Sequence, residues 1–273
     1  MTQAPPLSQQ VIWLTGASSG IGEALTDELA PRCKALFISA RSEEKLRPLA
    51  AKHSNVTVIT ADITDESSLH EAASTIEKAH GHLDTLIANA GTCEYVDVTD
   101  FDTQLFRRVF ETNVMGLVNT TAAALPLLQK SQRGYLVGVG SSVSMLAMPR
   151  AQAYGASKAA VAHFLESMKA DLKAMDIDVS LVSPGFVKTP LTDANDFPMP
   201  MRISAEQAAE EIVKGVEKRQ WHIHFPKGFT RILWFIGQLP AFLRHRITAQ
   251  MSRTDEALLQ QGKRQIKQQE SDS

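Results

Sequence analysis

Residues 11–22 read Val-Ile-Trp-Leu-Thr-Gly-Ala-Ser-Ser-Gly-Ile-Gly, an apolar run of strand length that leads directly into a glycine-rich turn. Glycines at such a turn allow a tight bend and let the backbone come close to a bound pyrophosphate, which then faces the N-terminus of the next helix. An ordinary strand-to-helix turn has a similar local pattern. The position of this turn within a longer alternation of strands and helices favours the phosphate-binding interpretation.

The same alternation continues along the chain. Nearly continuous apolar runs predict strands at 11–15, 35–40, 56–61, 83–88, 135–140, 179–183 and 221–225. Helical patterns lie between them at 20–30, 43–52, 66–79, 101–128 and 153–174, and Pro126 is expected to end or kink the fourth helix. This order predicts an α/β fold with a doubly wound, Rossmann-type parallel sheet and helices on both faces.

Length and composition indicate one globular domain. The chain has 273 residues, of which 44% are hydrophobic and 21% charged. We expect a single domain over 1–250, with an apolar helical extension from about 226, and a polar tail over 251–273 that frays. The 28 basic and 30 acidic residues give a net charge of −2, which offers no broad positive field for nucleic acid.

Targeting signals and membrane spans are not expected. Residues 1–10 have neither the basic start nor the apolar core of a signal peptide. The longest apolar stretch, 229–243, is interrupted by Arg231 and Pro240. As a helix it would rise roughly 22 Å, which is short of the ~30 Å hydrocarbon core. Two cysteines, Cys33 and Cys93, are too few for a disulfide framework, so we expect a cytoplasmic protein.

Several motifs together resemble those of the short-chain dehydrogenase/reductase family. The opening Thr-Gly-x3-Gly-x-Gly at 15–22 is followed in the family's order by further motifs: Asn89-Ala90-Gly91, Asn113, Ser141, Tyr154 with Lys158, and Pro184-Gly185. The resemblance covers about residues 11–190. It implies an oxidoreductase that interconverts a carbonyl and an alcohol with a nicotinamide cofactor.

The end of the second predicted strand favours NADP over NAD. An NAD site usually places an acid there to hold the ribose 2′-hydroxyl, but this chain has Arg41 and reaches its first acid at Glu43. A guanidinium pairs with a 2′-phosphate, which a carboxylate would repel. Ser18, Ser19 and Ser42 add hydroxyl donors. The alternative is that Arg41 merely begins the next helix in solvent.

Other cofactor contacts follow from the resemblance alone. Asp62 and Ile63 correspond to the pair beside adenine, Asn89 to the residue that steadies the central strand, and Thr189 with the Val187 backbone to the nicotinamide carboxamide site. For Asp62 a carboxylate in the loop before the next helix is the alternative. The implied set is Gly16, Ser18, Ser19, Gly20, Ile21, Gly22, Asp62, Ile63, Asn89, Ala90, Gly91, Tyr154, Lys158, Pro184, Gly185, Val187 and Thr189.

The catalytic residues implied are Asn113, Ser141, Tyr154 and Lys158. Tyr154 lies four positions before Lys158, so on a helix the phenol and the ammonium share one face. A cation there lowers the pKa of the phenol, which moves the proton of the product alcohol. Ser141 would polarise the substrate carbonyl, with Ser142 facing the other way. Asn113 resembles the residue that distorts its helix to hold a water in a proton relay; a helix-interior Asn bonded to local backbone is the alternative.

Substrate contacts are expected from residues that follow the fifth and sixth strands. Met145, Met148, Phe186 and Leu191 form an apolar set that suits an apolar carbonyl, although any of them could belong to the core instead. No metal site is expected, because the eight histidines are scattered and His222 and His224 alternate on a strand without a third ligand nearby.

Two apolar regions point to partners. Helices 101–128 and 153–174 carry apolar positions on more than one side, and in proteins that this chain resembles these helices close a twofold dimer, so we expect a homodimer or a homotetramer. Rings flanked by basic residues in 229–243 would cap the cleft or pack on a subunit, or, as a second choice, touch a membrane surface. The alternative to an enzyme is an NADP-binding sensor without turnover on the same fold.

Overall fold

The computed structural model describes residues 4–193, 195 and 197–252. Seven parallel strands form one sheet in the order β3-β2-β1-β4-β5-β6-β7. The side chains of β1 and β5 are buried throughout, because helices cover both faces of the sheet. The strands are β1 Val11–Thr15, β2 Ala35–Ala40, β3 Val56–Thr60, β4 Thr85–Ala88, β5 Tyr135–Val139, β6 Asp178–Pro184 and β7 His222–Phe225.

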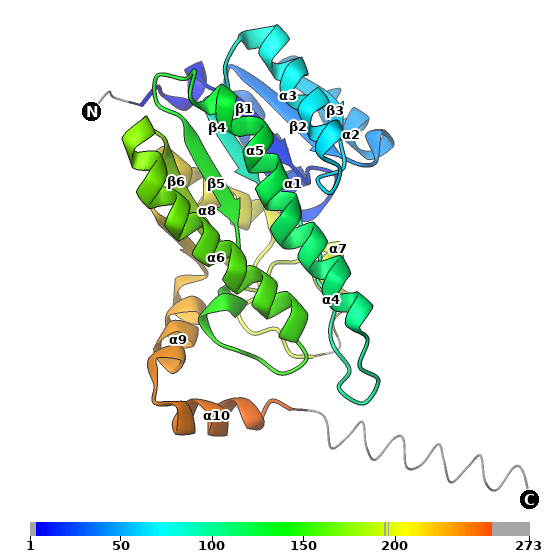
Figure 1. Ribbon diagram of the computed structural model, residues 1–273, viewed down its shortest axis with the longest axis vertical. Helices are drawn as coiled ribbons and strands as arrows, with labels where there is room; N and C mark the ends of the chain where they lie inside the picture. Colours follow the sequence, from blue (N-terminus) through cyan, green and yellow to red (C-terminus); the bar gives the residue numbers. More distant parts are fainter. Residues whose placement is uncertain (1–3, 194, 196, 253–273) are drawn as a thin grey trace, which may run out of the picture.

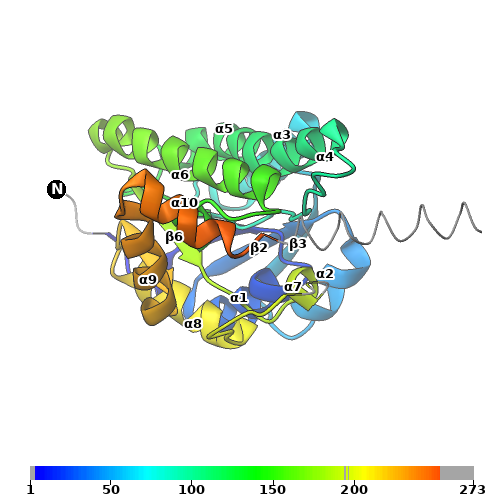
Figure 2. The ribbon, with the colours of Figure 1, turned by 90° about the horizontal axis from the view of Figure 1, so that it is seen from below.

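The helices form two layers, one on each face of the sheet (Figure 2). One layer holds α3, α4, α5 and α6, and the other holds α1, α2 and α8. Each layer buries its own apolar stripe, which includes Leu165 of α6 on the first face and Leu25 of α1 on the second. The helices are α1 Gly20–Leu29, α2 Glu43–Ala50, α3 Glu66–His80, α4 Thr103–Phe110, α5 Gly116–Leu128, α6 Gln152–Leu172, α7 Pro190–Asp193, α8 Ala205–Glu217, α9 Lys227–Gln238 and α10 Ala241–Ala249.

The strand order places a binding crevice at the carboxyl ends of β1 and β4. The chain runs outward from β1 to β2 and β3, and then returns to β4 on the other side of β1. Leu14 of β1 pairs in register with Ile38 of β2 and Ile87 of β4, so these three strands end at the same edge. Loops that leave neighbouring strands in opposite directions open a crevice at that edge. The predicted doubly wound, Rossmann-type single domain is therefore confirmed.

The predicted helix 101–128 differs from the observed structure. It consists of α4, a π-helical turn over Glu111–Met115, and α5. Pro126 was expected to end or kink this helix. This is wrong, because α5 continues through Pro126 to Leu128 and the interruption lies earlier in the chain. A proline cannot donate a hydrogen bond to the carbonyl four residues before it, but α5 nevertheless runs two residues past Pro126. The interruption is at Asn113, where the side chain bonds to other segments.

Some of the apolar side chains on α4, α5 and α6 that indicated a dimer are buried in the core of the protomer. Val109, Leu117 and Leu165 belong to the apolar pattern of the predicted helices 101–128 and 153–174, and they are buried within the protomer. Phe110 and Met168 are half-buried, and Met115 remains 42% exposed. The outer surface of α4, α5 and α6 is therefore less apolar than the sequence pattern alone suggested.

The chain continues after β7 into α9 and α10. Figure 1 shows α10 crossing the lower end of the molecule, with α9 connecting it to the rest of the protein. Among the described residues, no helix is long and apolar enough to cross a membrane. Residues 253–273, which make up nearly all of the tail that was expected to fray, lie outside the described residues.

Candidate active site

A cleft of about 900 Å³ lies at the carboxyl ends of the strands, between the loops that follow β1 to β6. It brings together most of the residues singled out in the sequence. These are Gly16, Ser18, Ser19, Gly20, Ile21, Arg41, Asp62, Ile63, Asn89, Ala90, Gly91, Ser141, Tyr154, Lys158, Pro184, Gly185, Val187, Thr189 and Leu191. Asn113 lines a smaller cavity instead, and Gly22 is buried beneath the turn.

The glycine turn is shaped by its own backbone and held by the loop after β4. Gly16 has a φ of 69°, which an L side chain rarely adopts. A Cβ on Gly22 would lie 2.1 Å from the Gly16 carbonyl oxygen, so only glycine fits there. The Asn89 amide donates hydrogen bonds to the carbonyls of Thr15 and Gly16, both at 3.1 Å. This contact fixes the turn to the central strand.

The N-terminus of α1 opens into the cleft. Ser19 precedes the helix and, within the described structure, makes no side-chain capping bond to it. The first N–H groups of α1 therefore remain available to an anion that lies against the turn. Ser18 and Ser19 line the same part of the cleft and add two hydroxyl groups.

The carboxyl end of β2 presents cations to the cleft. Arg41 and Lys45 both line it and are exposed, and neither forms an ion pair within the described part of the chain. Ser42 lines the cleft too, but its hydroxyl donates to a carboxylate oxygen of Glu44 at 3.1 Å. Lys45 is a cation that the sequence analysis did not single out. Its position one turn after Arg41 could have indicated it.

Asp62 and Ile63 lie at the cleft where β3 ends. One oxygen of Asp62 accepts hydrogen bonds from the Thr64 backbone at 3.0 Å and from its hydroxyl at 2.8 Å. The residue that caps α3 is Asp65, whose side chain accepts from the Ser67 backbone. The capping role at the start of α3, which was the alternative for Asp62, therefore belongs to Asp65.

Tyr154, Lys158 and Ser141 meet at the inner end of the cleft. Tyr154 and Lys158 lie on the first turns of α6, with the ammonium nitrogen 6.0 Å from the centre of the phenol ring. Lys158 Nζ donates a 2.9 Å hydrogen bond to the Val139 carbonyl at the end of β5. Ser141 follows β5, and its hydroxyl oxygen accepts from the Val143 backbone at 3.2 Å. The start of α6 and the end of β5 thereby hold Tyr154, Lys158 and Ser141 in place.

Burial shifts the pKa values of both titratable groups. It raises the pKa of Tyr154 above its ordinary value; nearby Cys93 adds to the rise, and a hydrogen bond with Ser141 opposes it. Burial lowers the pKa of Lys158 to about 8. In this geometry Ser141, and not Lys158, is the group that favours the phenolate. The expected lowering of the phenol pKa by Lys158 therefore stays a prediction.

Asn113 ties the loop after β4 to α6. Its side-chain oxygen accepts from the Thr92 backbone at 2.8 Å, and its amide donates to the Thr92 carbonyl at 2.9 Å and to the Ser157 hydroxyl at 3.0 Å. These partners are distant in sequence, which excludes a helix-interior Asn bonded only to local backbone. A Cβ on Gly91 would lie 3.1 Å from the Asn113 side-chain oxygen and 3.2 Å from Lys158 Nζ, so both groups close over Gly91.

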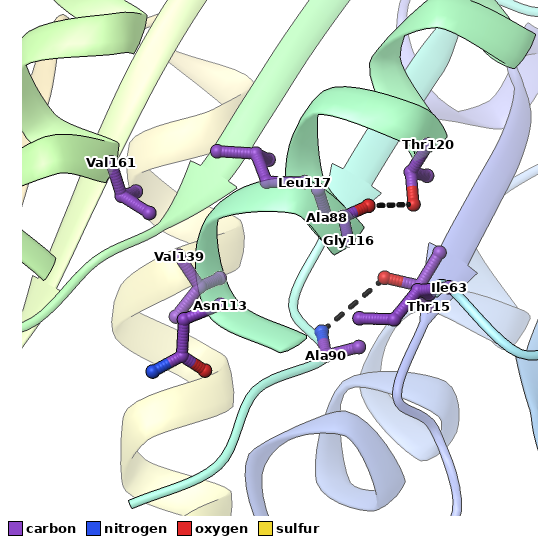
Figure 3. Close-up of a pocket in the computed structure, with 10 residues that line it drawn as sticks. All are labelled: Thr15, Ile63, Ala88, Ala90, Asn113, Gly116, Leu117, Thr120, Val139 and Val161. Carbon is purple, nitrogen blue, oxygen red and sulfur yellow. Dashed lines mark hydrogen bonds between the residues drawn. The ribbon is translucent and has the colours of Figure 1, made fainter. Parts of the chain in front are cut away.

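A small cavity lies beside the π-helical turn. Figure 3 shows Asn113 at its edge, together with Ala90 and Val139. The cavity has a volume of about 10 Å³, close to what one water molecule occupies. The expected role of Asn113 in a water relay remains a prediction, and this cavity is the place to look for it.

Cys93 and Tyr95 also lie beside Tyr154, and the sequence analysis did not place them there. Burial raises the pKa of the Cys93 thiol to about 11, and Lys158 opposes that shift. Burial also raises the pKa of Tyr95, to which Cys93 and Tyr154 contribute. Both residues follow Asn89-Ala90-Gly91 closely, and that position is the signal that could have identified them.

The predicted substrate residues separate into two groups. Leu191 lines the cleft and is exposed, whereas the described lining does not include Met145, Met148 or Phe186. Phe186 packs against other rings, with its centre 6.1 Å from Phe197 and 5.2 Å from Phe229. Phe197 in turn lies 5.4 Å from Tyr95. An aromatic row, Tyr95–Phe197–Phe186–Phe229, thus runs from beside Tyr154 to α9.

Comparisons with known proteins agree with this arrangement. The family described as short chain dehydrogenase matches residues 10–198. An uncharacterized oxidoreductase of Myxococcus xanthus is 34% identical over 224 residues, which cover 81% of this chain and 88% of that protein. The 11-beta-hydroxysteroid dehydrogenase 1A of Arabidopsis thaliana is 33% identical over 250 residues, covering 82% and 71%.

Solved structures share the fold. A short chain dehydrogenase from Burkholderia cenocepacia in complex with NADP superposes with a TM-score of 0.78 at 24% identity, covering 90% of this chain and 99% of that one. One from Burkholderia phymatum in complex with NAD gives 0.76 at 21%, covering 84% and 93%. The motifs at 15–22, 89–91 and 154–158, their meeting in one cleft, and the match over most of the chain lead to one conclusion. The chain belongs to the short-chain dehydrogenase/reductase family.

Proposed function

We propose that this protein is an NADP(H)-dependent oxidoreductase that interconverts a carbonyl and an alcohol. The observation that carries the proposal is that Tyr154, Ser141 and Lys158 lie in the same cleft as the glycine turn. A proton donor and a phosphate-binding turn are the two parts that hydride chemistry on a carbonyl needs from a protein.

The cleft fits a nicotinamide dinucleotide. The turn at Gly16 has no side chain in the way of a pyrophosphate, and the N-terminus of α1 faces that position. Two exposed cations, Arg41 and Lys45, line the cleft after β2, and a pair of cations there supports binding of a 2′-phosphate and so NADP over NAD. When bound, the cofactor supplies the hydride. Related folds are known in complex with NADP and with NAD, so the preference rests on the two cations.

Tyr154 is the proposed proton donor in reduction and the acceptor in oxidation. Its raised pKa keeps the phenol protonated at neutral pH, so it has a proton to give when negative charge develops on the substrate oxygen. The Ser141 hydroxyl donates to that same oxygen. Lys158, with a pKa of about 8, is mainly charged at pH 7 and places a positive charge 6.0 Å from the centre of the phenol ring.

An apolar carbonyl compound is the proposed substrate class. The aromatic row begins beside Tyr154, and Leu191 lines the cleft near the loop after β6. Such surfaces favour apolar ligands and offer few fixed polar contacts. The relative from Arabidopsis thaliana is named for a hydroxysteroid, which is an apolar alcohol that corresponds to a carbonyl compound of this class.

A panel of carbonyl compounds tests the function. NADPH consumption, followed by absorbance, should be fastest with apolar ketones and aldehydes and should fall to background in Tyr154→Phe. Tight NADPH binding without turnover on any member of the panel would instead favour the alternative of an NADP-binding sensor.

We also propose a cytoplasmic homodimer, with a tetramer as the less supported assembly. The free cysteines Cys33 and Cys93 suit a reducing compartment. The exposed Met115 and the half-buried Phe110 and Met168 mark the helical surface for the twofold contact. Light scattering across a dilution series should give a dimer mass at micromolar protein, and a persistent monomer mass would contradict the proposal.

A further inference from the structure

Helices α9 and α10 expose an unusual amount of apolar surface. Trp234 is 57% exposed, Phe235 63% and Phe242 71%, and Ile232 and Leu243 are exposed as well. Large rings in the open are unfavourable in water unless something covers them. These five residues, with the nearby cations Lys227, Arg231, Arg244 and Arg246, are called the C-terminal surface below.

The exposed rings do not belong to the side of α9 that packs on the protein, because that side is formed by other residues. Thr230 and Leu233 are buried, and Phe229 lies against Gly185 and Phe186. Gly237 lies so close to the Met145 carbonyl that a Cβ there would be 2.2 Å from the carbonyl oxygen. One face of α9 is thus fixed to the loops of the active site, and Ile232, Trp234 and Phe235 lie on the other side.

Helix α10 extends the same surface. None of its residues is buried, and Arg244 donates a 3.0 Å hydrogen bond to the Gly237 carbonyl at the end of α9. Figure 2 shows α10 in front of the two helical layers, when the molecule is seen from below. Helices α9 and α10, which carry the exposed rings, therefore lie together at one end of the molecule (Figure 1), and α9 contacts the loop after β5.

The charge of this segment differs from that of the rest of the chain. Residues 226–252 contain four Lys or Arg residues and no Asp or Glu. Because the whole chain has a net charge of −2, the remainder carries −6. An apolar surface on a segment whose only Asp, Glu, Lys or Arg charges are positive is complementary to a partner that is apolar within and negative at its boundary.

We propose that the C-terminal surface lies on an anionic lipid bilayer. Exposed Trp and Phe rings insert at the boundary between headgroups and acyl chains, and Lys and Arg beside them pair with lipid phosphates. A second copy of this chain fits less well. In a twofold contact the same surface faces itself, which would bring the cations together with no carboxylate in the segment to compensate.

Docking in this way would place the active site at the membrane. Phe229 connects α9 to Phe186, and Phe186 belongs to the loop that also carries Val187 and Thr189 of the cleft. The aromatic row therefore leads from the proposed bilayer contact toward Tyr154. An apolar substrate dissolved in the bilayer would meet the protein on the side where Phe229 of α9 ends the row.

Native tryptophan fluorescence provides the test. Trp13 is fully buried and Trp221 half-buried, so a vesicle-induced blue shift reports mainly on Trp234. Vesicles of phosphatidylcholine containing phosphatidylglycerol should shift the emission and co-sediment the full-length protein, while vesicles of phosphatidylcholine alone should bind at least tenfold less. Brominated lipids should quench the shifted emission.

Three variants make the result specific. The triple change Trp234→Ser, Phe235→Ser and Phe242→Ser should lower vesicle binding at least tenfold, and Phe101→Ser, a control at a ring that is also 57% exposed, should leave it unchanged. Trp234→Phe should abolish the blue shift but retain co-sedimentation. Circular dichroism of each variant confirms that it is folded.

Two results would overturn the proposal. The first is absence of co-sedimentation with either vesicle at low salt. The second is a triple variant that binds vesicles as the unchanged protein does, while its mass in light scattering falls from dimer to monomer, which would assign the surface to self-association. Neither result bears on turnover, so the proposed function stands or falls separately.

Discussion

Replacing Arg41 with alanine removes the guanidinium at the carboxyl end of β2, and we expect the protein to lose most of its preference for NADPH. In a water-like dielectric, a unit charge about 4 Å from a phosphate of about two negative charges gains roughly 2 kcal/mol. A charge-assisted hydrogen bond contributes a similar ~1.5–3 kcal/mol. Since Arg41 is exposed, the lower values apply, and the Kd for NADPH should rise about 10- to 30-fold.

The binding of NADH should change little in the same variant, because NADH has no 2′-phosphate. In the unchanged protein we expect NADPH to bind at least about tenfold more tightly than NADH, which corresponds to ~1.4 kcal/mol. Arg41→Asp should erase or invert the preference by replacing an attraction with a repulsion. Lys45→Ala should reduce the preference less than Arg41→Ala, since a flexible ammonium makes one point contact where a guanidinium makes two.

Isothermal titration of both cofactors into each variant at fixed ionic strength measures these differences. The effect should shrink with added salt, which screens exposed charges. Lys218→Ala, at an exposed cation after α8 that does not line the cleft, serves as the control. Equal affinity of the unchanged protein for NADPH and NADH would refute the reasoning, and so would an equal loss of both affinities in Arg41→Ala.

Two further predictions concern buried titratable groups. Burial lowers the pKa of Lys158 from 10.5 to about 8, so between these values the unfolded chain holds the proton and the folded chain does not. The free energy of unfolding should therefore gain a contribution on the order of 3 kcal/mol as the pH rises through that window, and urea titrations should show this gain missing in Lys158→Met. Burial raises the pKa of Cys33 and Cys93 to about 11, which leaves about a hundredfold less thiolate than at the ordinary value of 9.0. Iodoacetamide at pH 8 should thus alkylate both thiols far more slowly in the folded protein than in urea, and equal rates in mass spectra would contradict the burial.

The sequence predicted the parts of the fold that depend on local pattern. The run at 11–15 is apolar through Leu14 and forms β1 at those residues, and Glu43 and Gln152 begin helices within one residue of the predicted positions. The glycine turn could be predicted because its spacing serves a backbone geometry, and Gly16 and Gly22 have the positive φ and the close approach that this geometry demands.

Features that depend on contacts between distant segments could not be predicted in this way. Asn113 interrupts the helix where its side chain bonds to Thr92 and Ser157, and no local periodicity shows these contacts. Cys93 and Tyr95 reach the phenol because the loop after β4 folds over α6. Phe186 packs on Phe197 and on Phe229 of α9, a helix that lies far along the chain, and no local pattern shows these contacts; its contact with the substrate stays a prediction.

The central claim is that Tyr154 carries the proton in a carbonyl–alcohol interconversion. The most direct measurement compares NADPH oxidation by the unchanged protein and by Tyr154→Phe on the best carbonyl of the panel, with NADPH affinity measured in parallel. The substitution removes only the phenol hydroxyl, and with it the transferable proton and the hydrogen bond with Ser141. We predict that turnover falls to background while the Kd for NADPH stays within about threefold, less than 1 kcal/mol. Retention of more than a small fraction of turnover in the folded Phe variant would show that Tyr154 is not the acid/base group.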